Sequence, residues 1–422
     1  MASTKLRKTR FVCISDTHKA SPLDGAFKLP KGDVLIHAGD LSNQGSLSEL
    51  VKSLEWIEKA DFEVKIVVAG NHDITLDKHF YDDYGLYFHN QNPQNAEECR
   101  RLFLESETII YLNHESATIR LQDPNGPQTT FKAFGSPYSP ARGLWAFGYL
   151  PDNAPELWDK IPLDTDIVIT HTPPMYHCDE SKDRGAAGCT ALRQALWRVR
   201  PSLSICGHVH EGRGMQRVRW DLNSTHVKYK EEVIDVWEDP SAGTLKQCKI
   251  DLTAKGGKPL ANDRSIGDRI SPPDTINFLP TTLRKSIFDA WSVAEGTKSS
   301  HRDHNPIISS SSSASTVKVQ STGKNSSDHQ RYPYIFSHGH AHPSIRFASR
   351  GIGGISLTEL VDLEALSDRK GRQETCVVNA AIMASSWPHQ TRGGRKFNKP
   401  IVVDIDLPVW ESDKTDPDVE RP

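Results

Sequence analysis

Five short motifs bring together the side-chain types that bind metal ions. An Asp and a His stand two residues apart in DTH at 16–18, and another Asp follows Gly in GD at 39–40. Further along the chain are GNHD at 70–73, HTPP at 171–174 and GHVH at 207–210. Together they supply the candidate ligands Asp16, His18, Asp40, Asn71, His171, His208 and His210. Mixed oxygen and imidazole ligands of this kind suit Mn, Fe or Zn better than Mg or Ca.

A ligand set of this size can hold two cations, and paired cations suit the hydrolysis of phosphate esters. Two ions about 3.5–4 Å apart need a bridging carboxylate; together they bind a phosphoryl oxygen, generate a hydroxide at neutral pH and stabilise the displacement. Any single motif carries little weight, because Asp and Gly are common in the turns that follow strands. The GNHD and GHVH motifs are more specific, and five motifs in one order make coincidence a poor explanation.

The elements that must position these side chains are short strands, because each motif directly follows an apolar run. We predict strands before the five motifs at 10–15, 34–38, 64–69, 166–170 and 203–206. Apolar residues recur at helical spacing in 46–59 and 189–198, which predicts amphipathic helices between the strands. This alternation predicts an α/β fold over 10–210. Ligands of open α/β sheets bind outside the carboxyl ends of the strands, so five such ends can converge on one site.

The composition changes after residue 210, where the core of 1–210 gives way to a segment rich in Ser, Pro, Gly and charge. Residues 211–375 include a run of five serines and bury too little apolar surface to offset chain entropy. We predict that they form a long, largely disordered insertion that the core can lose. Apolar, strand-like sequence returns near the end, which predicts C-terminal strands at 376–410 that complete the core, followed by a tail at 411–422.

In this order the five motifs resemble those of the calcineurin-like metallophosphoesterases. The resemblance covers residues 10–210 and, less specifically, the C-terminal strands, and it implies a four-layer α/β/β/α sandwich. It also implies which side chains hold which divalent metal ion. One ion would be held by Asp16, His18 and His210, and the other by Asn71, His171 and His208. Asp40 would bridge the two ions, which we expect to be manganese, iron or zinc.

The same resemblance implies the residues that act on the substrate. His72 would protonate the leaving oxygen or steady the transition state, and Asp73 would orient His72. A hydroxide that bridges the two ions would attack the phosphorus. The implied enzyme is a dinuclear metallophosphoesterase.

Further motifs resemble a small branch of that superfamily, the metallophosphoesterase-domain proteins that include brain-type phosphodiesterases. They are GSPY at 135–138, WAF at 145–147, GHVHEGRG at 207–214 and, near the end, NAA followed by KPIVVDIDLP at 399–408. The branch implies phosphodiesters as substrates, with cyclic nucleotides among them. Its members join GHVHEG to the last strands by a short connection, so the insertion at 211–375 departs from the pattern.

Two other functions stay open. One is a phosphomonoesterase that acts on phosphoproteins, which a broad open groove would favour. The other is a non-catalytic binding scaffold of the same fold, which the loss of a ligand would favour, whereas every ligand position is filled here. A second GHxH at 339–342 lies inside the predicted insertion, and we interpret it as a surface histidine cluster. Tyr138 and Trp145 are candidates for either core packing or the wall of a substrate site.

Composition and charge limit the expected partners. Lys and Arg number 51 against 54 Asp and Glu, for a net charge of −3, which favours neither bulk nucleic acid nor an anionic membrane. No apolar run approaches the roughly 18 residues that cross a membrane. Seven cysteines without a CxxC pair indicate free thiols in a reducing compartment, so we expect the cytoplasm or the nucleus. The expected partners are a small-molecule or nucleotide phosphoester and, through 211–375, docking proteins.

Overall fold

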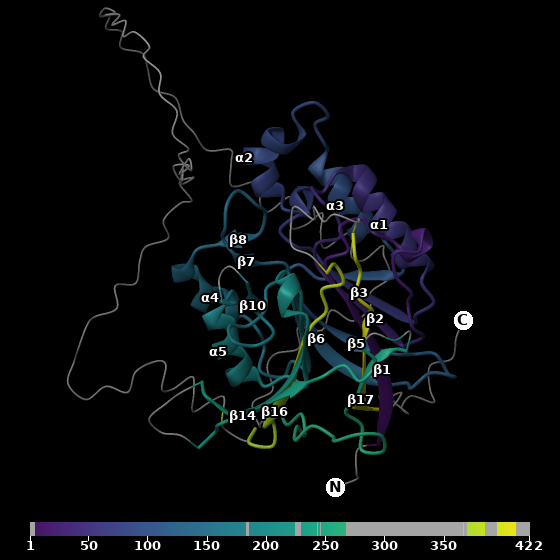
Figure 1. Ribbon diagram of the computed structural model, residues 1–422, viewed down its shortest axis with the longest axis vertical. Coiled ribbons are helices and arrows are strands. Elements are labelled where there is room, and N and C mark those ends of the chain that lie inside the picture. The colour runs from purple at the N-terminus through teal and green to yellow at the C-terminus, as the bar shows by residue number, and fades with distance from the viewer. Residues whose placement is uncertain are drawn as a thin grey trace, which may run out of the picture. The chain divides into compact units, whose positions relative to one another are not determined.

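Two β-sheets form the centre of the fold (Figure 1). The computed structural model describes residues 5–182, 185–223, 229–242, 244, 246–266, 366, 369–384 and 395–410. These residues belong to one compact unit. No helix in this part of the chain has the length and apolar character needed to cross a membrane. All seven cysteines lie within it, and each is buried and free of a disulfide.

The first sheet has six strands, and its parallel strands carry the first three motifs. Its order is β15 (Cys248–Asp251), β17 (Ile401–Pro408), β1 (Leu6–Ile14), β2 (Val34–Ala38), β3 (Val64–Val68) and β4 (Ile109–Tyr111). β1 to β4 run parallel, whereas β17 pairs antiparallel with β1. β2 and β3 are buried along their whole length, which explains why their sequences are nearly continuous apolar runs.

The second sheet has seven strands and carries the other two motifs. Its order is β14 (Glu231–Trp237), β13 (Gly214–Trp220), β16 (Glu374–Asn379), β12 (Leu203–Cys206), β9 (Ile167–Thr170), β6 (Thr130–Ser136) and β5 (Glu115–Arg120). The four central strands β16, β12, β9 and β6 run parallel. β13, β14 and β5 are antiparallel to their neighbours, so only the middle of the sheet has the parallel order that aligns strand ends.

Helices cover the outer face of each sheet, which gives the fold four layers (Figure 1). The first sheet packs against α1 (Leu47–Lys59), α2 (Lys78–His89) and α3 (Ala96–Leu104), and the second against α4 (Ala154–Asp159) and α5 (Thr190–Val199). Side chains of β1 alternate between the layers: Phe11 and Cys13 face the second sheet, whereas Val12 and Ile14 face the helices. The predicted α/β/β/α sandwich is confirmed.

Short elements complete the connections between the layers. They are the 3₁₀ helices η1 (Pro22–Asp24), η2 (Ile74–Leu76), η3 (Pro151–Asn153) and η4 (His210–Gly212), and the paired short strands β7 (Ser139–Pro140) with β8 (Gly148–Tyr149) and β10 (Glu180–Ser181) with β11 (Gly185–Ala186). β7 and β8 hold together the two ends of the loop at 141–147.

The structure differs from the predicted boundary at residue 211. Strands β13, β14 and β15 all lie in residues that were assigned to the insertion, and they extend both sheets. Arg217 and Arg219 of β13 pair with Glu374 of the neighbouring strand β16, so the charges that suggested low complexity are ion pairs of a folded sheet. The remainder of the predicted insertion, 267–365, lies outside the described residues, as does the tail from 411.

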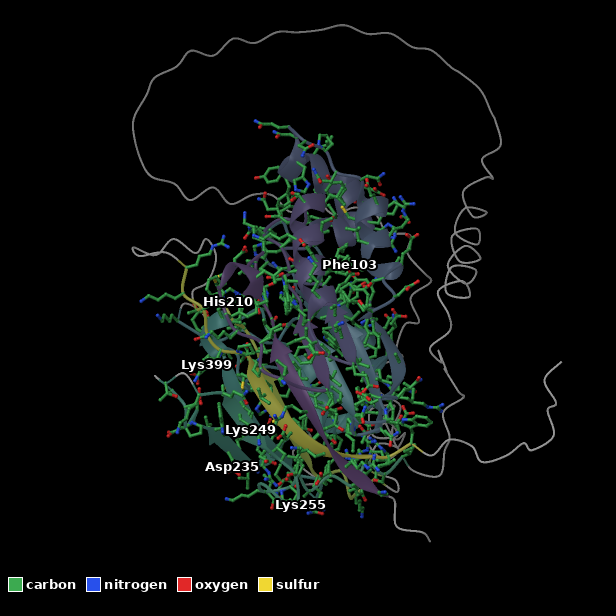
Figure 2. All side chains as sticks on the ribbon, turned by 90° about the vertical axis from the view of Figure 1, so that its right-hand side faces the viewer. Phe103, His210, Asp235, Lys249, Lys255 and Lys399 are labelled. Carbon is green, nitrogen blue, oxygen red and sulfur yellow. The ribbon has the colours of Figure 1, made fainter. Side chains whose placement is uncertain are left out.

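The chain on the two sides of 267–365 is paired, in what we call the neck. Asn262 and Arg372 form an antiparallel bridge, flanked by hydrogen bonds from Asp263 N to Gly371 O and from Gln373 N to Ala261 O. Arg372 also donates to Thr165 O, just before β9 begins, whereas the HTPP motif follows the other end of β9. Figure 2 accordingly shows Lys255, which is close to the neck in sequence, at the opposite end of the strands from His210.

Candidate metal centre

The seven predicted ligands come together at one edge of the two sheets. Each of the five motifs begins within two residues of a strand end, after β1, β2, β3, β9 and β12. Three groups of side chains have ligand atoms that all lie within 4.8 Å of one another. The groups are Asp16, His18 and His210; His18, Asp40 and His72; and Asp40, His171 and His208. The convergence that the strand ends predicted is therefore present in the fold.

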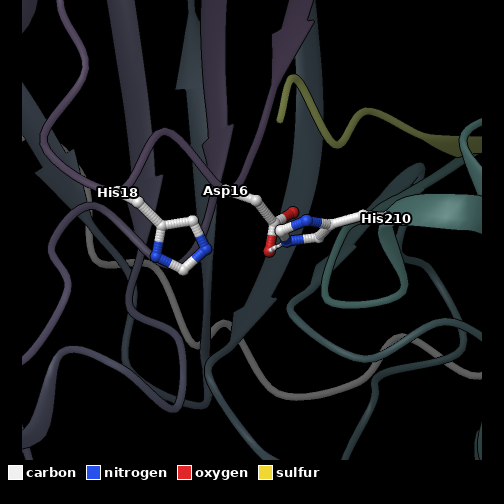
Figure 3. Close-up of side chains that lie close together, drawn as sticks. All are labelled: Asp16, His18 and His210. Atoms are coloured by element: carbon white, nitrogen blue, oxygen red, sulfur yellow. Dashed lines mark ion pairs between the residues drawn. The ribbon is translucent and has the colours of Figure 1, made fainter. Parts of the chain in front are cut away.

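The first group is Asp16, His18 and His210, which Figure 3 shows around one point. His210 Nε2 lies 3.3 Å from Asp16 Oδ1. The rings of His18 and His210 have their centroids 5.5 Å apart. These three side chains come from the loops after β1 and β12, one in each sheet, so the group exists only when the sheets are packed together.

The second group surrounds Nε2 of His171. Asn71 Oδ1 is 2.9 Å from this atom, His208 Nδ1 is 3.2 Å away and Asp40 Oδ1 is 3.4 Å away. Two ring nitrogens and two oxygens thus point at the same small volume. This is the donor set that was expected to hold the second ion, with Asp40 added.

Asp40 is the carboxylate that faces both groups. Its Oδ1 is directed at His171, as above, and its Oδ2 lies 3.8 Å from His18 Nε2 in the first group. The backbone N–H of His72 donates to Oδ1 over 2.9 Å, which holds the carboxylate in this orientation. A side chain so placed can contact two ions at once.

Backbone carbonyls orient the histidine rings from outside. Nδ1 of His18 bonds to Ser42 O at 3.1 Å, and Nδ1 of His171 bonds to Ala38 O at 3.0 Å. A carbonyl only accepts, so Nδ1 carries a proton in both rings, and Nε2 can offer its lone pair to a metal ion when the ring is neutral. Histidines that bind metals are generally held in this way, because the outer hydrogen bond sets both the tautomer and the ring orientation.

The buried carboxylates of the cluster favour the binding of a cation. Asp16 and Asp40 are buried, and burial alone would raise their pKa values, yet His210 beside Asp16 and His171 beside Asp40 lower both pKa values below the ordinary range. Burial lowers the pKa of His171 too, but Asp40 outweighs it and raises the pKa to about 9. Buried carboxylates thus need positive charge here, and a divalent ion bound to neutral histidines supplies it. The residues fit a divalent metal ion.

Several of these residues have backbone angles that side chains usually avoid. Asp16, His18, Asp40 and His208 have φ of 56°, 44°, 54° and 67°, in the left-handed region. Such conformations cost about 1–3 kcal/mol each and gather at functional sites. The chain turns sharply after each strand so that the next side chain points into the centre.

Two motif glycines allow the loops to approach the carboxylates. A Cβ on Gly70 would collide with Oδ1 of Asp40, and one on Gly207 would collide with Oδ2 of Asp16. The glycine that precedes the ligand residues in GNHD and GHVH is therefore required for close packing, not for a turn type.

His72 and Asp73 have different hydrogen-bond partners. His72 Nδ1 bonds to Asn43 O at 2.7 Å. The Asp73 carboxylate instead accepts from the backbone N–H groups of Leu41, Ser42 and Gly70 and from the Ser42 hydroxyl. Asp73 thus fastens the loop after β2 to the loop after β3, and the expectation that it orients His72 stays a prediction. Burial and then the charge of Asp40 raise the pKa of Asp73 to about 7.

Three side chains outside the predicted ligand set support the centre. Asn379 donates to Cys178 O and to Val209 O, and so ties the loops after β9 and β12 to the end of β16. His37 contacts the hydroxyl of Thr17 over 3.0 Å, and Arg395 donates to His18 O. Asn379 begins the NAA motif noted in the sequence, and it ends an apolar strand just as the ligand motifs follow theirs.

A pocket of about 210 Å³ opens over the centre. Its floor consists of predicted site residues, namely His18, Asp40, Asn71, His72, His208 and His210. Its opposite wall is the single segment from β7 to β8, which contributes Ser139, Pro140, Ala141, Arg142, Trp145, Ala146 and Gly148. A larger hollow of about 360 Å³, lined by α1 and α3 residues such as Glu58 and Arg101, has no side chain of the centre in its lining. The second GHxH at 339–342 lies outside the described residues.

Comparisons with known proteins found one matching family model and several similar proteins. Residues 9–212 match the family model described as calcineurin-like phosphoesterase. Metallophosphoesterase domain-containing protein 1 of Homo sapiens is 38% identical over 230 residues, which are 52% of this chain and 65% of that protein. A UPF0046 protein of Caenorhabditis elegans is 30% identical over 217 residues, 49% of this chain and 71% of that protein.

Two further likenesses are more limited. A probable rhamnogalacturonate lyase C of Emericella nidulans is 41% identical over 228 residues, which are 52% of this chain but only 19% of that protein. A purple acid phosphatase from yellow lupin shares 14% identity, with 53% of this chain and 41% of that chain covered, at a TM-score of 0.31. The chain thus spans less than two-thirds of the human relative's length and a small part of the fungal one.

Proposed function

Because the chain belongs to the calcineurin-like phosphoesterase family, in the branch of the metallophosphoesterase domain-containing proteins, we propose that it hydrolyses phosphate esters in a metal-dependent reaction. The observation that carries this proposal is the shared carboxylate of Asp40, which faces two groups of metal-ligand atoms at the floor of one pocket. The proposal includes two divalent ions for each chain, of manganese, iron or zinc.

The roles of the ligands follow from their positions. Asp16, His18 and His210 would hold one ion, and Asn71, His171 and His208 the other, with Asp40 shared. When bound, the ions would polarise a phosphoryl oxygen and make water nucleophilic at neutral pH. The complete ligand set disfavours a scaffold without activity, because a scaffold has no need to keep all seven donors.

His72 would assist the departure of the leaving group. Its Nδ1 is engaged by Asn43 O, so a proton given to the substrate would come from Nε2. The ring lines the pocket beside Asp40 and Asn71, where a substrate phosphate would lie. General acids of this kind contribute typically about 10²–10⁴-fold to the rate.

We place phosphodiesters ahead of monoesters as substrates, because of the similarity to the metallophosphoesterase domain-containing branch and because of the residues in the pocket wall. The wall offers Pro140, Ala141 and Trp145 to a second ester substituent and Arg142 to an oxygen of the phosphate. A phosphomonoesterase remains the alternative that the assay decides.

The test is an assay of the full chain with bis-p-nitrophenyl phosphate and p-nitrophenyl phosphate side by side. Protein stripped of metal by chelation is reloaded separately with Mn²⁺, Fe²⁺ or Zn²⁺, and bound metal is counted by elemental analysis. We expect no turnover without metal, two ions per chain after reloading and a higher kcat/KM for the diester. Preference for the monoester would favour the phosphatase alternative, and absence of turnover with every metal would overturn the proposal.

A further inference from the structure

Trp145 is the largest side chain in the pocket wall, and it packs on His72. The two ring centroids are 4.0 Å apart, with an angle of 36° between the ring planes. Phe88 of α2 supports Trp145 from behind, at a centroid distance of 5.6 Å. The indole thus lies between a helix of the outer layer and the residue that would act on the leaving group.

The backbone around Trp145 is fixed to the site as well. Ala146 N donates to Asn71 O, the carbonyl next to His72 in the chain, and Phe147 N donates to the carboxylate of Asp77 over 2.9 Å. The wall and the GNHD loop are therefore connected by hydrogen bonds. A shift of the indole would change the position of the His72 ring.

His72 is restrained from three directions. Nδ1 bonds to Asn43 O at 2.7 Å, the ring of His18 meets it edge-on at 4.8 Å, and Trp145 covers one face. The hydrogen bond to Asn43 alone would let the ring rotate about the bond axis. The close, tilted contact with Trp145 limits this freedom, because a rotation of the imidazole would either break the contact or bring the two rings into collision.

We propose that Trp145 is a positioning residue that holds the His72 ring at a set angle to the substrate and presents its outer edge to the leaving group. This inference rests on the proposed function, since it gives a task to the residue that would protonate the leaving oxygen. It also explains why an aromatic side chain remains half-buried at the rim of a polar pocket, where packing alone would bury it fully.

The kinetic test compares Trp145→Ala and Trp145→Phe with the full-length parent. The substrates are two diesters, methyl p-nitrophenyl phosphate and methyl phenyl phosphate. They share the methyl phosphate group and differ only in the leaving group, which is p-nitrophenol in one and phenol in the other. The poorer leaving group needs the proton more, so Trp145→Ala should lower its kcat by about 10-fold or more and that of the nitrophenyl ester by about 3-fold or less. KM should change by the same factor for both esters, because both carry the methyl substituent that Trp145 would contact. Trp145→Phe should restore most of the loss in kcat.

Trp237→Ala is the matched control, because Trp237 is also half-buried but packs on the core between the sheets from β14. It should affect both esters alike. Equal losses on the two esters in Trp145→Ala, with the metal content retained, would show that the indole only lines the pocket and would overturn the proposal. So would unchanged rates on both esters.

A second measurement does not depend on turnover. An indole whose ring centroid lies 4.0 Å from that of His72 shifts the NMR signals of the His72 ring protons by its ring current. In protein with labelled histidine, assigned through His72→Gln, these signals should move toward ordinary values in Trp145→Ala and stay near the parent in Trp237→Ala. If the shift is present but no ester is hydrolysed, the proposed function fails while the contact stands. If the signals do not move, the positioning role fails whatever the activity.

Discussion

At the scale of single residues, Asp40 is the side chain on which the proposed two-ion centre depends. No other carboxylate in the described cluster has one oxygen toward each ligand group. A bridging carboxylate neutralises part of the repulsion between two cations, so its charge matters to both. The proposed two-ion centre would therefore depend on this one side chain more than on any single histidine.

The substitution Asp40→Asn should consequently reduce bound metal and activity more than the substitution of a ligand that contacts one ion. We expect it to lose at least one metal ion per chain and nearly all activity while it keeps the fold, since Asn has the same shape. Elemental analysis and circular dichroism check this, with Asp24→Asn on the exposed helix η1 as the control. Two ions per chain with near-normal turnover would contradict the bridging assignment.

His72 belongs to one of the three ligand groups by distance, so its role must be separated from metal binding. If it acts on the leaving group, His72→Ala should lower kcat by about 10²–10⁴-fold and keep the metal. The loss should be smaller for good leaving groups. His79→Ala on the exposed side of α2 is the control. A fall in bound metal that parallels the fall in activity would identify His72 as a ligand instead.

Asp73 is predicted to act on stability rather than on catalysis. Asp73→Ala leaves the N–H groups of Leu41, Ser42 and Gly70 without their buried acceptor. Each unsatisfied buried group costs about 1–3 kcal/mol, so the free energy of unfolding should fall by about 3 kcal/mol or more. Urea unfolding measures this. If Asp73→Ala has normal stability but shows the same dependence on the leaving group as His72→Ala, Asp73 orients His72 as the sequence suggested.

At the scale of elements, a strand end and the turn after it form the repeated unit of the site. An apolar strand is buried between layers, and a sharp turn with left-handed residues then aims a polar side chain inward. The GHVH motif after β12 has this context in the second sheet. The GHAH at 339–342, outside the described residues, follows an apolar YPYIF but lies in a region whose composition differs from the core.

We therefore predict that only the first of the two motifs serves the centre. His210→Ala should abolish activity and reduce bound metal, because it removes the partner of Asp16. His342→Ala should leave both unchanged. Parallel assays of turnover and metal content decide this, and comparable damage from the two substitutions would mean that the second motif takes part.

At the scale of the whole molecule, the neck joins the two chain segments that flank 267–365. The two chain segments that flank 267–365 are already paired to each other, so the fold itself brings the ends together. The neck lies by the start of β9, and the metal centre lies by its end. Closing such a loop costs little more for a long segment than for a short one, since each doubling of length adds only about 0.6 kcal/mol.

Replacement of 267–365 by a short Gly/Ser linker should accordingly leave a folded, metal-binding and active protein with an unchanged melting temperature. Replacement of Arg213–Glu374, which composition alone marks as dispensable, removes β13, β14, β15 and most of the neck and should not give folded protein. Calorimetry and the diester assay compare the two. Insoluble protein from the first replacement would show that 267–365 is needed by the core.

The sequence by itself determined the parts of this protein that are local. An apolar run followed at once by Asp, Asn or His is visible in a few residues, and it predicted the strands, the seven candidate ligands and, by resemblance, the layered fold. It failed where side chains meet across long separations. In the sequence, the charges of Arg217 and Arg219 suggest a solvated loop. In the fold both side chains pair with Glu374, which lies far along the chain.

Only the tertiary structure decided which partner each polar group takes. Asp73 stands next to His72 in the sequence, yet its carboxylate turns away to the loop after β2, because that loop offers it two backbone N–H groups. Asp40 faces two ligand groups only because the sheets pack with their strand ends aligned. Trp145 reaches His72 from a loop more than seventy residues away. Hydrogen bonds and ring contacts depend on ångström distances between loops, and the packing of the two sheets sets those distances.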